Sequence, residues 1–249
     1  MSSNIEQLKF INHDLCDMKL IGIPGGGKTR TIIEKIIHMK NDGIIEKNEN
    51  FLILTFSRKS REDFLNKGQE RINKLFINDN VRTIHSVSAI IMRNLFNKTS
   101  SNLNTLIAGL YHLLKYNDID FSNVKCLRNC KYIFVDEAQD ISDIQYNTIL
   151  KISEICKANV IMIGDPDQNI YQFQGGSDKY LIEHSDKCVN LIKNYRSTKN
   201  IINFINQFRP WKKMTPPMIS MRDTDGDKPK IYCNKIEILL ESLFNEIKN

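Results

Sequence analysis

The chain has 249 residues, of which 41% are hydrophobic and 26% charged, and its formal net charge is +6. This composition is typical of a globular protein with one large or two modest domains, and it excludes a chain that is disordered throughout. The longest apolar stretches have only the length of strands and the N-terminus lacks an apolar signal region. We therefore expect an intracellular protein that is neither secreted nor inserted in a membrane.

Four apolar runs are each followed by glycine, polar or acidic residues: "MKLIGI" (18–23), "FLILTF" (51–56), "KYIFVD" (131–136) and "NVIMIGD" (159–165). Longer segments with helical periodicity alternate with them, such as 28–40, whose isoleucines fall on one helical face. Buried parallel strands have this pattern. The sequence therefore predicts an α/β fold with a mainly parallel sheet, in which ligands bind at the carboxyl ends of the strands.

The pattern is weaker in the middle and at the C-terminal end of the chain. Residues 97–105 are typical of a loop and residues 106–116 of a short helix. The prolines and lysines of 209–218 indicate a connection, beyond which we expect one strand within 228–234 and one helix over 235–249. A lone strand and helix cannot bury a core, so we expect additional sequence to complete this part.

The segment "GIPGGGKT" matches the pattern G-x4-G-K-T and lies between a predicted strand and a predicted helix. Glycines allow backbone N–H groups to close around phosphates, and the start of the helix adds positive potential. Lys28 would reach the terminal phosphates of ATP and Thr29 would ligate Mg²⁺. A glycine-rich turn with a purely structural role needs neither side chain. The predicted ATP-binding loop comprises Gly22, Ile23, Pro24, Gly25, Gly26, Gly27, Lys28 and Thr29.

The segment "YIFVDEAQD" (132–140) places acidic residues at the end of an apolar run. In a nucleotide hydrolase with such a loop, Asp136 would hold Mg²⁺ and Glu137 would orient and deprotonate the attacking water. Neighbouring residues at a strand end point to different sides, so the two roles are compatible. A solvated acidic turn is the alternative, and the ATP-binding loop upstream makes it the minor one.

Besides these two segments, five others carry recognisable motifs: "IEQLKF" (5–10), "LTFSRKSREDF" (54–64), "RTIHSV" (82–87), "GDPDQNIYQFQGG" (164–176) and "LIKNYRSTKNI" (191–201). Together with the two above, they resemble in order the motifs of superfamily 1 DNA helicases of the UvrD, Rep and PcrA type, over most of 1–208. The resemblance implies a P-loop NTPase with a RecA-like, three-layer fold in 1–190. Residues 191–249 would then begin a second, incomplete RecA-like lobe.

The resemblance assigns several side chains to ATP. Gln7 would read the adenine edge, although a glutamine near the N-terminus is otherwise a surface residue. Arg30 follows the threonine of the loop as it does in the family. Gln168 would sense the γ-phosphate, Tyr195 would stack on adenine, and Arg196 would reach the γ-phosphate across the cleft between the lobes.

The resemblance also assigns residues to single-stranded DNA. The positions that match the family's DNA contacts are Phe56, Ser57, Lys59, Thr83, His85, Tyr171 and Phe173. Stacking of bases on aromatic rings tolerates any sequence, which suits a motor that moves along DNA. Outside the family, Phe56 would be a core aromatic and a lone histidine is more often structural. Arg58 replaces a residue that is often Asn in the family, and Phe173 replaces a Trp that offers a larger stacking face.

The function that the resemblance implies is ATP hydrolysis coupled to 3′-to-5′ movement along single-stranded or 3′-tailed duplex DNA. Residues 97–129 would replace a larger helical insertion of the family, called 1B. No segment resembles the family's motifs V and VI, the second of which supplies an arginine finger. We therefore expect slow hydrolysis by this chain alone, with a longer product or a second polypeptide supplying the rest of the second lobe.

Two other functions are compatible with parts of the sequence. The main alternative is an ATP- and DNA-binding module, or a remnant, without significant turnover. A P-loop ATPase or kinase unrelated to nucleic acid would leave the segments "GDPDQNIYQF" and "NYRS" unexplained.

Overall fold

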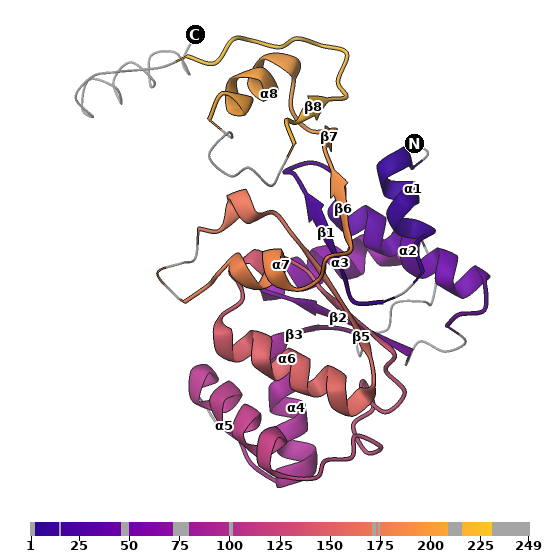
Figure 1. The fold of residues 1–249 in the computed structure, drawn as a ribbon, viewed down its shortest axis with the longest axis vertical. Helices are drawn as coiled ribbons and strands as arrows, with labels where there is room; N and C mark the ends of the chain where they lie inside the picture. The colour runs from indigo at the N-terminus through magenta and orange to yellow at the C-terminus, as the bar shows by residue number, and fades with distance from the viewer. Residues whose placement is uncertain are drawn as a thin grey trace.

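The computed structural model describes residues 3–14, 16–45, 50–71, 80–99, 102–170, 173, 175–208 and 216–230. Its centre is a six-stranded sheet in the order β3-β2-β4-β5-β1-β6 (Figure 1). The strands are β1 (Met18–Gly22), β2 (Phe51–Thr55), β3 (Val81–Thr83), β4 (Tyr132–Val135), β5 (Asn159–Gly164) and β6 (Cys188–Leu191). Every neighbouring pair in this sheet is parallel. The predicted α/β fold with a mainly parallel sheet is confirmed.

Helices cover both faces of the sheet. They are α1 (Ile5–Ile11), α2 (Lys28–Asn41), α3 (Arg58–Arg71), α4 (Ile84–Phe96), α5 (Leu103–Tyr116), α6 (Asp143–Cys156) and α7 (Lys179–Glu183). Phe10 of α1 and Ile36 of α2 belong to one core, whereas Ile91 of α4 and Ile152 of α6 belong to another. In Figure 1 the strands lie between α2 and α3 on one side and α4, α5 and α6 on the other.

The central strands are buried along their whole length, as in β1 and β2. Because helices cover both faces of the sheet, side chains on both sides of each strand are buried. Polar and apolar residues therefore do not alternate along these strands, which explains the continuous apolar runs in the sequence. Lys19 is the polar residue within β1, and its ammonium donates to the Ile182 carbonyl. The predicted site residues follow β1, β4 and β5 at one edge, because parallel strands end on the same side.

One predicted boundary is wrong, and two strands of the main sheet, β3 and β6, were not predicted. Residues 103–105, expected in a loop, form the first turn of α5. The Asn102 side chain accepts a hydrogen bond from Thr105 N–H at 3.1 Å, and this cap starts the helix earlier than its apolar periodicity does. Strand β3 has only three residues, which is too short to give a recognisable pattern.

After β6 the chain leaves the main sheet and forms a small unit. This unit comprises β7 (Lys193–Asn194), α8 (Lys199–Asn206) and β8 (Ile219–Ser220), and β7 pairs in parallel with β8. Ile202 of α8 packs with Met218 and with Ile23, which follows β1. Figure 1 shows the small unit beyond the end of β6. The predicted helix over 235–249 and most of the predicted strand within 228–234 lie outside the described residues.

Helix α1 is held against α2 by a buried lysine. Lys35 is 2% exposed, and its ammonium donates to the Ile11 carbonyl at 2.8 Å and to the His13 carbonyl. Burial lowers the pKa of Lys35 to about 8, and the Asp14 carboxylate opposes this shift. The lysine satisfies carbonyls at the end of α1 that have no partner within the helix. It thereby fixes α1 beside the loop that follows β1.

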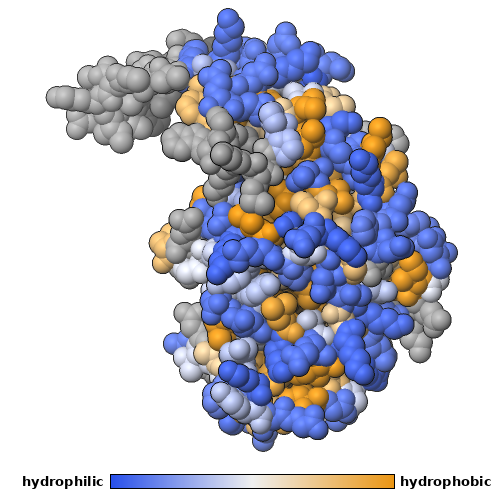
Figure 2. All heavy atoms as spheres, viewed as in Figure 1, coloured by the Kyte–Doolittle hydropathy of each residue, from blue (hydrophilic) through white to orange (hydrophobic). Residues whose placement is uncertain are grey.

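Within the described part of the chain, no helix is both long enough and apolar enough to cross a membrane. Polar residues cover most of the face seen in Figure 2, where apolar residues form small separate groups.

Candidate active site

The loop after β1 has the conformation of a phosphate cradle. Gly25 and Gly27 adopt φ values of +67° and +85°, in the left-handed region that favours glycine. A Cβ on Gly22 would lie 2.5 Å from Lys28 Cγ, so the lysine stem requires this glycine. The Lys28 ammonium donates to the Gly22 carbonyl at 3.0 Å, and α2 begins at Lys28. The helix start and the lysine therefore place positive potential over the loop.

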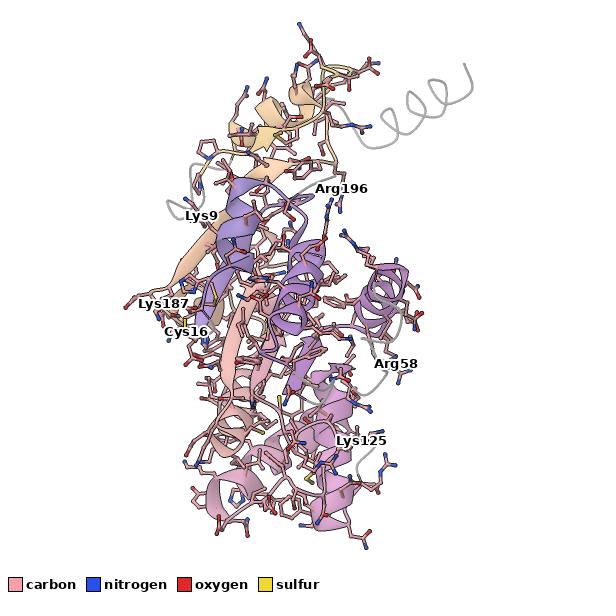
Figure 3. The ribbon with its side chains drawn as sticks, turned by 90° about the vertical axis from the view of Figure 1, so that its right-hand side faces the viewer. Lys9, Cys16, Arg58, Lys125, Lys187 and Arg196 are labelled. Atoms are coloured by element: carbon pink, nitrogen blue, oxygen red, sulfur yellow. The ribbon has the colours of Figure 1, made fainter. Side chains whose placement is uncertain are left out.

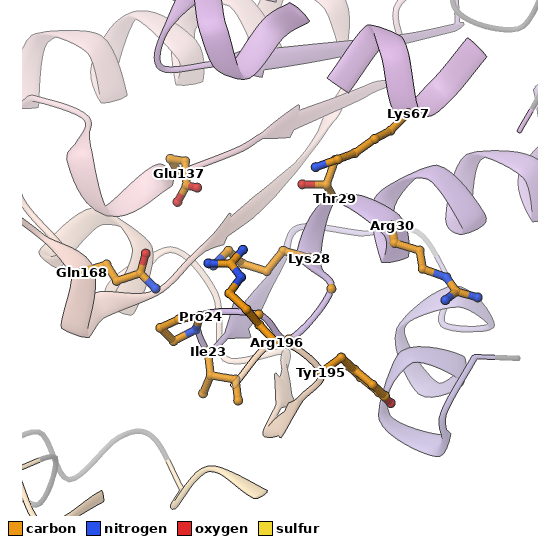
Figure 4. A pocket seen from close by; sticks show the side chains of 13 residues that line it. Ile23, Pro24, Lys28, Thr29, Arg30, Lys67, Glu137, Gln168, Tyr195 and Arg196 are labelled. Atoms are coloured by element: carbon orange, nitrogen blue, oxygen red, sulfur yellow. The ribbon is translucent and has the colours of Figure 1, made fainter. Parts of the chain in front are cut away.

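A pocket of about 410 Å³ opens in front of this loop (Figure 4). Residues 23–30 line it together with side chains from elsewhere in the chain: Lys67, Glu137, Gln168, Tyr195 and Arg196. The structure thus brings together predicted residues from four separate segments. Figure 4 shows Arg30 directed away from Lys28, and Arg30 Nε lies 4.0 Å from Glu34 Oε1.

The two acidic residues after β4 differ in exposure. Asp136 is 6% exposed and does not line the pocket, and its Oδ1 accepts from Glu137 N–H at 3.1 Å. Burial, followed by the Glu137 carboxylate, raises the pKa of Asp136 to about 7, while the Lys28 ammonium opposes the shift. Glu137 has a φ of +54°, and its side chain reaches the pocket wall.

These residues fit a hard divalent cation. A buried carboxylate beside a second carboxylate resists ionisation, and a cation bound there would restore the charged form. Thr29 lines the pocket together with Glu137, the neighbour of Asp136, and the Thr29 hydroxyl adds an oxygen ligand of the kind that Mg²⁺ prefers. Asp136 and Thr29 are therefore the residues suited to hold Mg²⁺ here.

Gln168 follows β5 on a 3₁₀ turn, η3 (Pro166–Gln168). Its Nε2 donates to Asp165 Oδ2 at 2.9 Å, and Asp165 Oδ1 accepts from Asp167 N–H at 3.1 Å. Asp165 is fully buried, so its carboxylate shapes the turn from inside. The Gln168 side chain is held at the pocket wall by this arrangement.

Gln139 connects the turns after β4 and β5. Its Nε2 donates to Glu137 Oε2 at 3.0 Å and to Asp140 Oδ2 at 3.2 Å, and its Oε1 accepts from Asp165 N–H at 3.1 Å. Gln139 is 2% exposed, so these bonds form away from competing water. We call the hydrogen-bonded series Glu137, Gln139, Asp165 and Gln168 the Gln139 bridge.

Tyr195 and Arg196 reach the pocket from the turn after β7. Tyr195 N–H donates to the Gly25 carbonyl at 3.1 Å. A Cβ on Gly25 would lie 2.8 Å from Arg196 Cβ, so the turn rests directly on the loop. Figure 3 shows Arg196 at the junction between the small unit and the main sheet.

Helix α1 contacts both the loop and Tyr195. Asn4 Nδ2 donates to Tyr195 Oη at 2.7 Å, and Gln7 Nε2 approaches the Gly26 carbonyl at 3.4 Å. Gln7 Oε1 accepts from Asn4 N–H at 3.0 Å, and the side chain is 4% exposed. The amide of Gln7 is therefore engaged by protein groups next to the loop, and Gln7 is not among the residues that line the pocket.

Three residues of this site were not predicted from the sequence: Lys67, Gln139 and Asn194. Lys67 lies on α3, and Figure 4 shows its ammonium near Thr29 across the pocket from Arg196. No local pattern marks it, because only the packing of α3 brings it there. Gln139 lies two residues after Glu137 and Asn194 directly before Tyr195, so their positions within the quoted segments were available signals.

Three of the predicted DNA contacts, Phe56, Ser57 and Thr83, line two further cavities. Phe56 and Ser57 line a cavity of about 220 Å³ that also touches Glu137 and Gln168. A second cavity, of about 200 Å³, is lined by Arg58, Arg61, Glu62, Arg82, Thr83 and Ser86.

The residues predicted to contact DNA differ in their hydrogen bonds and in their exposure. Thr83 Oγ1 accepts from Ser86 N–H at 3.2 Å and thereby caps α4. Burial lowers the pKa of the half-buried His85. Lys59 is exposed, and Phe173 is 79% exposed. Tyr171 lies outside the described residues.

Comparisons with known proteins agree on one group of relatives. The family model described as AAA domain matches residues 10–174 of the chain. An Acanthamoeba polyphaga mimivirus protein, provisionally named ATP-dependent DNA helicase R568, is 35% identical over 214 residues, which are 82% of this chain and 30% of the relative. The ATP-dependent DNA helicase PcrA of Staphylococcus epidermidis is 33% identical over 108 residues, which are 41% of this chain and 15% of the relative.

Among solved structures, the Pif1 helicase of Candida albicans has a TM-score of 0.50 at 10% identity, over 77% of this chain and 40% of that one. At this identity the likeness shows the fold alone. The chain spans less than a third of the length of the two curated relatives.

Proposed function

The chain belongs to the AAA domain family, among the N-terminal regions of superfamily 1 DNA helicases of the UvrD, Rep and PcrA type, and on this premise we propose that it binds ATP with Mg²⁺ and single-stranded DNA. One observation carries the proposal. Lys28, Glu137, Gln168 and Arg196 come from four segments and line one pocket in front of a glycine-rich loop. Loop N–H groups, a helix start and two cations suit a triphosphate.

Each residue of the pocket would have a distinct task. Lys28 would bind the β- and γ-phosphates, and Arg196 would bind the γ-phosphate from the opposite side. Tyr195 would stack on adenine, with Asn4 holding its hydroxyl. Gln7 would reach the adenine edge once its contact with Gly26 gives way, since that contact is long at 3.4 Å. Lys67, which also lines the pocket, adds positive charge beside Thr29.

Hydrolysis would depend on the residues after β4 and β5. Glu137 would accept the proton of the attacking water, and Gln139 would hold the Glu137 carboxylate in place. Gln168 would contact the γ-phosphate from the end of the Gln139 bridge. Mg²⁺, when held by Thr29 and Asp136, supplies charge neutralisation at the phosphates. Water is the nucleophile, and ADP and phosphate are the products.

The DNA strand would run over the loops beside this pocket. Phe56 and Phe173 would contact bases, and Ser57 and Lys59 would lie along the strand. Thr83 and His85 would lie near its backbone. Arg58, Arg61 and Arg82 add positive charge around Thr83, which supports a phosphate contact there. Tyr171, outside the described residues, would accompany Phe173.

We also propose that the chain has two parts, 1–190 and 191–249, and that the second begins a RecA-like lobe. β6, the last strand of the main sheet, ends at Leu191, and the chain then enters the separate sheet of β7 and β8. With a complete second lobe, from a longer product or another polypeptide, hydrolysis would drive 3′-to-5′ movement along DNA. The helicase names of the relatives support this function over a binding module without turnover.

The test is steady-state ATP hydrolysis with and without single-stranded DNA. We expect DNA to raise a slow basal rate. Lys28→Ala should abolish nucleotide binding, while Glu137→Gln should keep binding and lower the rate about 10²- to 10⁴-fold. Lys40→Ala, an exposed lysine on the same helix as Lys28, is the matched control and should leave both unchanged. A rate that none of these changes affects, with DNA still bound, would show a binding module instead.

A further inference from the structure

The side chain of Asn194 joins two segments that are far apart in the sequence. Its Nδ2 donates to the Pro24 carbonyl at 2.6 Å, within the loop after β1. Its Oδ1 accepts from Arg196 N–H at 2.8 Å and from Ser197 N–H at 2.7 Å. Asn194 is 2% exposed, so water does not compete for these bonds.

The two ends of the amide have separable tasks. Hydrogen bonds from the next residues to Oδ1 are the local turn that asparagine often makes, and an aspartate or serine makes the same turn. The bond from Nδ2 to Pro24 is not part of that turn and requires an amide donor. A role in the turn alone therefore accounts for the hydrogen bonds to Oδ1. It does not account for the buried Nδ2 donor, which bonds to the loop after β1.

The turn fits the loop closely. A Cβ on Gly25 would lie 2.8 Å from Arg196 Cβ and 3.1 Å from Asn194 Nδ2. Tyr195 N–H donates to the Gly25 carbonyl at 3.1 Å. The loop and the turn thus meet through backbone and short contacts, and a displacement of Pro24 displaces the base of the Arg196 side chain.

The backbone of Asn194 is also fixed to the small unit. The Asn194 carbonyl accepts from Met221 N–H at 2.8 Å, and Asn194 is in register with Ser220 of β8. Arg222 Nη1 donates to the Arg196 carbonyl at 3.0 Å. Asn194 is therefore a point at which the small unit is attached to the phosphate-binding loop.

We propose that Asn194 is a positioning residue that couples the loop to Arg196 and so sets how strongly the site prefers a triphosphate over a diphosphate. The inference rests on the proposed function, because it assumes that Arg196 faces the γ-phosphate. Lys28 would hold the β-phosphate, which ATP and ADP share, as well as the γ-phosphate, whereas Arg196 would act only on the γ-phosphate, which ADP lacks. Asn194 would not touch the nucleotide and would act through Arg196.

The test compares ATP and ADP affinity in Asn194→Asp, Arg196→Ala and the double variant. Asn194→Asp keeps the Oδ1 acceptor and the side-chain shape but puts an oxygen against the Pro24 carbonyl. We expect the ratio of ATP to ADP affinity to fall about tenfold or more in each single variant, and no further in the double variant. Asn203→Asp, an exposed asparagine of α8, adds the same charge and should leave the ratio unchanged.

Different results of this test would overturn the role of Asn194 and the proposed function on which it rests. Additive effects in the double variant, or an unchanged ratio in Asn194→Asp beside a reduced one in Arg196→Ala, would overturn the inference alone. Absence of ATP binding that depends on Lys28 would overturn the proposed function, and the inference with it. If Asn194→Asp does not fold, Asn194→Ser decides, because its hydroxyl keeps the turn but is too short to reach Pro24.

Discussion

The Gln139 amide nitrogen donates a hydrogen bond to Glu137 Oε2 at 3.0 Å, from a side chain that is itself buried. The same amide accepts from the N–H of Asp165, so it ties the turn after β4 to the turn after β5. Glu137 and Gln168, at the two ends of this bridge, both line the pocket. The two side chains are therefore connected through one buried residue that does not itself line the nucleotide pocket.

Replacing Gln139 by Ala should lower kcat more than it changes KM for ATP. The change removes the group that orients the Glu137 carboxylate and leaves the N–H of Asp165 without its acceptor, which costs about 1–3 kcal/mol of stability. We expect kcat to fall roughly 10- to 100-fold, since a misplaced base loses much of its contribution. Gln207→Ala, at an exposed position after α8, is the control. Equal kinetic constants in a folded Gln139→Ala protein would contradict this role.

The close packing of Gly164 against Gln139 predicts an effect on stability. A Cβ on Gly164 would lie 2.3 Å from Gln139 Oε1 and 2.8 Å from Leu181 Cδ2. Gly164→Ala should therefore lower the free energy of unfolding by about 1–3 kcal/mol. Gly109→Ala is the matched control in α5, where a Cβ meets Met92 Cε at 3.9 Å. It should raise stability by about 0.5–1 kcal/mol, since alanine favours helix more than glycine does. Both are measured by urea unfolding.

Asp140 predicts a pH dependence of stability. Burial, followed by the Glu137 carboxylate, raises the pKa of Asp140 from 3.8 to about 6. Between these values the folded state holds a proton that the unfolded state has released, so this stabilising contribution is lost as the pH rises through about 6. Asp140→Asn cannot ionise and still offers Gln139 an oxygen.

The measurement for Asp140 is the unfolding midpoint from about pH 4 to about pH 7. The advantage of Asp140→Asn over the wild type should grow with pH across this range. Asp118→Asn, an exposed aspartate, controls for the loss of one charge. A constant difference for Asp140→Asn would show that its carboxyl group titrates alike in the folded and unfolded states.

The exposed ring of Phe173 predicts a DNA contact. Phe173→Ala should weaken binding of single-stranded DNA by about 1–3 kcal/mol, the usual worth of stacking one base on an aromatic ring. Nucleotide affinity should be unchanged, because Phe173 does not line the nucleotide pocket. Tyr116→Ala removes another exposed aromatic, on α5, and should leave DNA affinity as it is. Fluorescence anisotropy of a labelled oligonucleotide measures both, and equal loss in the two variants would refute a specific contact.

The parts of the fold that depend on local pattern were predictable. The strand positions and the phosphate-binding loop follow from continuous apolar runs, from glycines and from the helix start at Lys28. β3 was not predicted because three residues give no period, and the start of α5 was misplaced because a single side-chain cap at Asn102 decides it. The four predicted strand regions all belong to the one sheet.

Contacts across the fold were not predictable in the same way. Lys67 reaches the pocket only because α3 packs beside α2, and no spacing along the chain records this. The contact of Gln7 with the Gly26 carbonyl depends on how α1 docks through Lys35, and its predicted role at adenine stays a prediction. The double role of Asn194 depends on the distance between Pro24 and the turn after β7. Such features come from tertiary packing.

The most direct test of the central claim is the affinity for single-stranded DNA with and without a saturating, non-hydrolysable ATP analogue. If the Gln139 bridge links the nucleotide pocket to the DNA-facing loops, the two affinities should differ by about 5- to 150-fold, the usual range of coupling between sites. In Gln139→Ala the difference should largely disappear while both ligands still bind. An identical DNA affinity in the wild type, with and without the bound analogue, would contradict the claim.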